Sequence, residues 1–84
     1  MTLGETRDVL GQLVGRSAVV SVVLPEQDEA AVSWGRMTIE EPLTLNEAFF
    51  RKADWIGEQE LLRIWFRNGV SVYIGGIKPR FPNP

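Results

Sequence analysis

The chain has 84 residues, 11 acidic and 9 basic, with a formal net charge of −2, and it contains neither Cys nor His. A single domain of this size has a marginal core, and the composition excludes disulfides and the usual His or Cys zinc sites. The negative charge argues against a generally basic surface for nucleic acid, so any such site must be local.

Location and assembly follow from the same composition. No segment approaches the roughly 20 apolar residues of a membrane span. Residues 1–5 lack the basic start and the apolar centre of a secretory signal. We therefore expect a cytoplasmic protein with no membrane partner. Because a small core without disulfides or metal gains stability from association, we also expect a homo-oligomer.

Residues 1–15 predict a short helix. Thr2 and Glu5 have the spacing of a capping box, and Gly15 is suited to end the helix. Apolar residues recur between them at helical spacing: Val9, Leu10, Leu13 and Val14. We expect this helix to form only by packing its apolar stripe on another element.

From residue 17 onward the apolar period changes to two, which predicts strands at residues 17–24, 30–40 and 43–50. Gly35, inside the second of these, indicates a sharp bend. Trp34 and Arg36 share one face of that strand, since successive side chains point to opposite faces. The polar residues 51–59 are predicted to form a loop.

The last third of the chain predicts a β-hairpin. Residues 60–67 and 70–74 alternate in polarity and are joined at Asn68-Gly69. Both turn residues tolerate positive φ, which the tight turn of a two-residue hairpin requires. A two-residue turn is therefore expected there.

These elements define a mostly β fold class. A short N-terminal helix is followed by a five-stranded, strongly bent antiparallel small barrel over residues 1–76, and the Pro-rich residues 77–84 form an extended tail. Alternation places the apolar side chains of three strands in the barrel interior: Val20, Val22, Leu24, Ile64, Phe66, Val70 and Val72.

The second and third predicted strands carry an apolar residue, a glycine, a further apolar residue and then two leucines: Val32, Gly35, Met37, Leu43 and Leu45. The hairpin adds Arg67 before its turn and an aromatic-apolar pair that begins at Tyr73. These positions resemble the two signatures of the Sm-like (LSm) family. Glu41 takes the place of the acid in the family's loop, which is shorter here and lacks a clear equivalent of the Asn that reads a base.

The resemblance implies an Sm-like barrel that assembles into a hexameric or heptameric ring, with the fourth strand of one subunit pairing with the fifth of the next. The pore-side loops of such rings bind single-stranded RNA. On this basis the expected RNA-binding residues are Arg67, Asn68, Gly69 and Glu41. An arginine suits base stacking or phosphate binding, although an exposed cation that keeps the hairpin soluble is an equal alternative. Turn geometry alone also explains Asn68-Gly69.

Trp65 is a candidate centre for a subunit interface. It alternates with Ile64 and Phe66, so it points away from the core. Trp and Arg are enriched at the energetic centres of interfaces, and the expected interface consists of outward-facing residues of the hairpin: Leu61, Arg63, Trp65 and Tyr73. A base-stacking platform that includes Trp34, Trp55 and Trp65 is the alternative.

The resulting hypothesis is a ring-forming protein that binds single-stranded RNA or serves as a scaffold for an RNA–protein assembly. We expect no catalysis, cofactor or metal, because the chain has no His, Cys, phosphate-binding glycine loop or nucleophile elbow. The alternatives are an SH3-like protein-interaction module and a structural subunit of a phage or mobile-element assembly, both without nucleic-acid binding.

Overall fold

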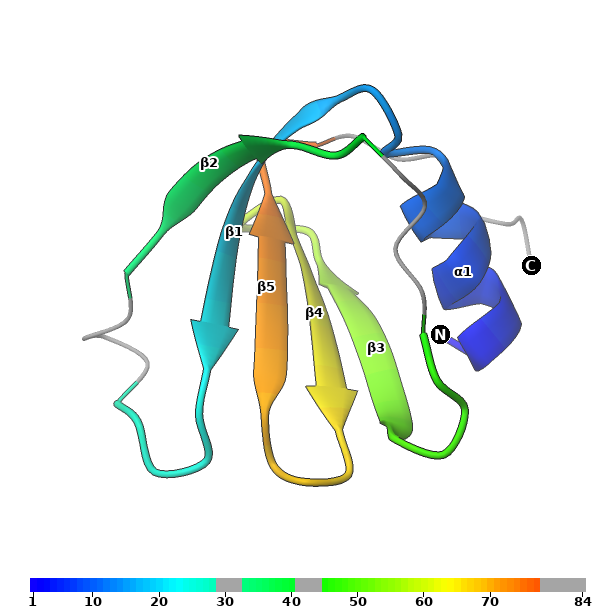
Figure 1. Ribbon diagram of the computed structural model, residues 1–84, viewed down its shortest axis with the longest axis vertical. Coiled ribbons are helices and arrows are strands. Elements are labelled where there is room, and N and C mark those ends of the chain that lie inside the picture. The colour runs from blue at the N-terminus through cyan, green and yellow to red at the C-terminus, as the bar shows by residue number, and fades with distance from the viewer. Residues whose placement is uncertain (29–32, 41–44, 78–84) are drawn as a thin grey trace.

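The computed structural model describes residues 1–28, 33–40 and 45–77. One helix is followed by five strands: α1 (Leu3–Gly11), β1 (Ser17–Val23), β2 (Gly35–Thr38), β3 (Phe50–Ile56), β4 (Leu61–Phe66) and β5 (Ser71–Gly75). Neighbouring strands are antiparallel in the order β2-β1-β5-β4-β3, and α1 lies beside β3 (Figure 1). The prediction of a mostly β fold with one N-terminal helix and five antiparallel strands is confirmed. In the described residues the sheet is not closed, since β2 and β3 remain as its edges.

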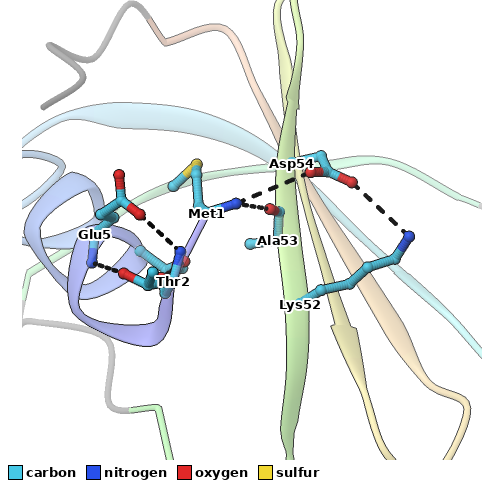
Figure 2. A network of polar contacts seen from close by, with 7 residues as sticks. Met1, Thr2, Glu5, Lys52, Ala53 and Asp54 are labelled. Atoms are coloured by element: carbon cyan, nitrogen blue, oxygen red, sulfur yellow. Dashed lines mark hydrogen bonds and ion pairs between the residues drawn. The ribbon is translucent and has the colours of Figure 1, made fainter. Parts of the chain in front are cut away.

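The helix begins as the sequence predicts. The Thr2 hydroxyl accepts a hydrogen bond from the Glu5 N–H (3.1 Å), and the Glu5 carboxylate accepts one from the Thr2 N–H (2.9 Å), which completes the capping box (Figure 2). The Met1 ammonium donates to the Ala53 carbonyl (2.8 Å) and lies 4.0 Å from the Asp54 carboxylate. These contacts hold the start of α1 against β3.

The third strand lies later in the chain than predicted. Asn46 forms a turn instead, because its side-chain oxygen accepts from the Ala48 N–H (2.9 Å) and its carbonyl accepts from the N–H groups of Phe49 and Phe50 (both 3.0 Å). The strand prediction for residues 45–49 is therefore wrong, and so is the loop prediction for residues 51–56, which belong to β3. The polar side chains of β3 lie where one face of an antiparallel sheet meets solvent, which a strand tolerates.

The predicted hairpin is present as β4 and β5, but its turn is longer than expected. The Phe66 N–H donates to the Val70 carbonyl (2.9 Å), so three residues separate this last pair. Gly69 has a φ of 87°, whereas Asn68 does not adopt positive φ and its side chain accepts from the Val70 N–H (3.0 Å). The two-residue turn is wrong, and a three-residue loop with a left-handed glycine takes its place.

The hairpin of β4 and β5 lies in the interior of the sheet, which bears on the expected pairing between subunits. β4 pairs with β3 and β5, and β5 pairs with β1 and β4, all within one chain. Neither strand therefore has a free edge, so the expected pairing of β4 and β5 across subunits is wrong. The edges that remain belong to β2 and β3.

The core lies on the inner face of the sheet, which we define as the face packed against α1. Its centre is a cluster of nearly fully buried side chains: Val9, Leu10, Leu13, Ala18, Ile39, Leu62, Ile64, Ile74 and Ile77. Of the predicted interior residues, Ile64 belongs to this cluster, and three more pack against it: Val20, Phe66 and Val72. Part of the predicted interior is therefore confirmed.

The remaining predicted interior residues are less well covered. Val22 and Leu24 are 52% and 56% exposed, so their placement in the core is wrong, and Val70 is half-buried. The reason is that α1 lies beside β3, away from the end of β1 (Figure 1). The part of the inner face that α1 leaves uncovered contains a hollow of about 220 Å³. Apolar side chains line this hollow, among them Met37 and Phe66.

Some predictions fall on parts of the chain that the structure does not describe. Glu41, Leu43 and residues 78–84 of the predicted tail lie outside the described residues. Ile77, at the start of that tail, is buried in the core. In residues 1–28, 33–40 and 45–77, no helix is long and apolar enough to cross a membrane.

Candidate functional site

The outer face of the sheet, opposite α1, carries a row of aromatic and cationic side chains. Strand alternation and register place Arg63 and Trp65 of β4 on this face with Tyr73 of β5 and Lys52 of β3. Trp34, just before β2, lies against Tyr73. We call these five residues the outer-face row.

The members of the outer-face row are in contact along its length. The ring centres of Trp34 and Tyr73 are 5.8 Å apart, with an angle of 40° between the rings. The guanidinium carbon of Arg63 lies 4.6 Å from the Tyr73 ring centre and 4.4 Å from that of Trp65. Lys52 Nζ lies 4.5 Å from the Trp65 ring centre. Each of these separations is within the range of attraction between a cation and a ring, or between two rings.

Serine hydroxyl groups support this arrangement at its Trp34 end and at its middle. Ser21, which is buried on β1, donates to the Ser33 carbonyl (2.9 Å) and so holds the backbone next to Trp34. Arg63 Nη2 donates to Ser71 Oγ (3.4 Å) on β5. The local backbone and one cation of the row therefore have defined partners.

The charge of the outer face is opposite in sign to that of the whole chain. Arg36, which pairs with Val19 of β1, adds a third cation to those of Arg63 and Lys52. Within the described strands, Asp54 is the acidic residue of this face. An outer face with more cations than acids can therefore exist on a chain of net charge −2.

The residues predicted as an interface are brought together by the fold. Leu61, Arg63 and Trp65 lie on the same face of β4, and Tyr73 stands opposite Arg63 in the register. They therefore share one face of the sheet, although Tyr73 is buried there (7% exposed). Their role in assembly stays a prediction.

The residues predicted to bind RNA lie elsewhere. Arg67, Asn68 and Gly69 form the turn between β4 and β5, outside the outer-face row. Arg67 donates through its backbone to the Phe49 carbonyl (2.7 Å) and through Nε to the Phe50 carbonyl (3.3 Å), so it ties the turn to the start of β3. The fourth predicted residue, at position 41, is outside the described residues.

The sequence analysis misses one member of the outer-face row, Lys52, which falls in the predicted loop of residues 51–59, and it places Trp34 only in the alternative stacking platform. The alternation of polar and apolar residues through residues 51–56 is the signal that places Lys52 on a strand. Trp55, a member of the alternative stacking platform, faces inward and packs against the core.

A metal-dependent site has no support in the part of the chain that the structure describes, because no three acidic, His or Cys side chains cluster there. No family model, curated protein or solved structure matches the chain. The outer-face row is therefore the feature of the described residues that bears on function.

Proposed function

We propose that this protein binds single-stranded RNA on the outer face of its sheet. The observation that supports this is the continuous chain of contacts among three rings and two cations in the outer-face row. Proteins that bind single strands stack bases on aromatic side chains and contact the phosphates with nearby cations. We propose RNA rather than DNA as the ligand because the resemblance to the Sm-like family implies RNA.

The expected ligand is an unpaired strand with little base preference. A duplex presents its base edges and phosphates, but its base planes are already stacked on one another. Its bases therefore cannot stack on the aromatic side chains of the protein. Stacking accepts any base, because every base has a flat face. Few cations take part, so we expect weak binding, about micromolar, that decreases with salt.

The test is titration of labelled oligouridine and oligoadenosine at low salt. Trp34 is 45% exposed at one end of the row, and stacking contributes about 1–3 kcal/mol per base. Trp34→Ala should therefore weaken binding to both oligonucleotides by about tenfold. Trp55→Phe is the matched control, because Trp55 faces the core, and it should leave binding unchanged. No binding by the parent chain, or equal losses in both variants, would refute the proposal.

The outer-face row also supports a second candidate, a protein–protein interface. Trp, Tyr and Arg are the residues most enriched at interface centres, and β2 and β3, which are the edges of the sheet within the described residues, offer a further route to self-association. We propose on this basis that this chain is a small barrel of the Sm-like or SH3-like type. Copies of it would then associate into a ring. Native mass measurement is the test: a ring that dissociates in Trp65→Glu supports this candidate, and a parent chain that is monomeric eliminates it.

A further inference from the structure

Lys52 is the loosely held cation of the outer-face row. Its Nζ lies 3.9 Å from the Asp54 carboxylate and 4.5 Å from the Trp65 ring centre. The two side chains of this ion pair are 52% and 53% exposed. Ion pairs at such exposure are weak and are screened by salt. Lys52 can therefore leave these contacts at little cost.

Arg63 is held from several sides. Its guanidinium lies against the rings of Trp65 and Tyr73 and donates to the Ser71 hydroxyl (3.4 Å). A planar guanidinium stacks on rings, whereas the lysine ammonium is a compact charge on a flexible stem. Arg63 is therefore suited to keep two rings in place, and Lys52 is suited to move.

The position of Lys52 affects what Trp65 can bind. Lys52 stands opposite Trp65 in the register, and its ammonium lies over the Trp65 ring. A base cannot occupy that position while the ammonium is there. The phosphate of a stacked nucleotide offers the ammonium a charge-assisted hydrogen bond, which is stronger than a ring contact in solvent.

We propose that Lys52 exchanges its contacts with Trp65 and Asp54 for a phosphate of the bound strand, while Arg63 keeps its intramolecular contacts. This exchange rests on the proposed binding of single-stranded RNA. Lys52 is then the phosphate-contacting residue of the site, and its departure frees for stacking the part of the Trp65 ring that its ammonium covers, while Arg63 stays beside the same ring. Asp54 is the residue that opposes the exchange.

The first test is the salt dependence of oligouridine binding by the parent chain and by Lys52→Met. Each phosphate contact to a single strand contributes about 0.7 to the slope of log affinity against log salt. The variant should have a slope smaller by about 0.7, so that between 50 and 200 mM salt it loses about 2.6-fold less affinity than the parent. Arg51→Met is the matched control. It removes the same charge from the bulge next to Lys52, outside the row, and should keep the parent slope.

The second test is a double-mutant cycle between Lys52 and Asp54. Asp54→Asn should strengthen oligouridine binding at least about twofold in the parent chain, because it releases Lys52. In the Lys52→Met background the same change should have a clearly smaller effect. An effect of equal size in both backgrounds would mean that Asp54 acts only through its charge, which overturns the exchange.

The two proposals fail in different ways. If the parent chain does not bind oligouridine, the proposed function fails and the exchange fails with it. If the parent binds and Lys52→Met has the parent slope, the exchange alone is refuted. Because the Lys52 side chain is half-exposed, the variant should fold normally, and circular dichroism checks this.

Discussion

Substitutions of two adjacent valines at the end of β1 test which face of this strand is buried. Val22 lies on the face that sequence alternation assigns to the interior, yet it is 52% exposed. Val23 lies on the opposite face and is only 4% exposed, opposite the buried Ser71. A Val→Thr substitution keeps the shape and the β-branching and adds a hydroxyl group. Comparing Val22→Thr with Val23→Thr therefore isolates burial from strand propensity.

The expected costs differ clearly. A buried hydroxyl without a partner costs about 1–3 kcal/mol, so Val23→Thr should lower the free energy of unfolding by that amount. Substitutions at exposed positions usually stay within about 0.5 kcal/mol, so Val22→Thr should be nearly neutral. Leu62→Ala, at a fully buried site, should cost about 2–5 kcal/mol and shows how large a core loss is in this chain.

Urea denaturation followed by tryptophan fluorescence measures these differences, with the midpoints compared at constant slope. Each kcal/mol also corresponds to a shift of roughly 4–8 °C in melting temperature for a domain of this size. If Val22→Thr costs as much as Val23→Thr, Val22 is buried and the exposure described for it is wrong. The sequence-based assignment of the interior would then be right there.

Four further outcomes are expected. Gly69→Ala should cost about 1–2 kcal/mol in urea denaturation, because φ is 87° and a Cβ would lie 3.0 Å from Pro25 Cγ. Gly11→Ala, with open space around its Cβ, should instead stabilise the chain by about 0.4–1 kcal/mol, and a loss of stability there would contradict the helix assignment. Thr2→Ala removes the helix cap and should cost about 1 kcal/mol. The backbone and then the side-chain hydrogen bond with Thr2 lower the pKa of Glu5 below its ordinary 4.5. The stability that this carboxylate contributes should thus be present above pH 4.5 and lost as the pH falls through the lower folded value, a dependence that melting curves of Glu5→Gln should lack.

Several features of this protein depend on local sequence alone. The capping box of Thr2 and Glu5 begins α1 because its two hydrogen bonds close within one turn. The hairpin of β4 and β5 follows from alternation around Asn68-Gly69, and the same alternation correctly placed Trp65 and Arg63 on the face away from the core. Each of these depends on residues close together in the chain, so one short stretch contains the necessary information.

The third strand shows where local patterns were insufficient. Residues 43–50 and the segment after them both permit a strand, and the turn hydrogen bonds of Asn46 decide between the two. The choice also depends on pairing of the later segment with β4, including the register shift between Phe50 and Lys52. A register between distant strands is set by packing of the whole sheet, which no single stretch contains.

Only the tertiary structure decided which apolar side chains are covered and which aromatic side chains meet. Val22 is exposed because α1 lies beside β3 and away from the end of β1, a docking position that alternation within β1 cannot express. Trp34 meets Tyr73 because β1 lies between β2 and β5, and Arg63 joins them because β4 lies on the other side of β5. The outer-face row is therefore a product of strand order, which arises from long-range pairing, whereas the outward direction of Arg63 and Trp65 was already determined by the two-residue period of β4.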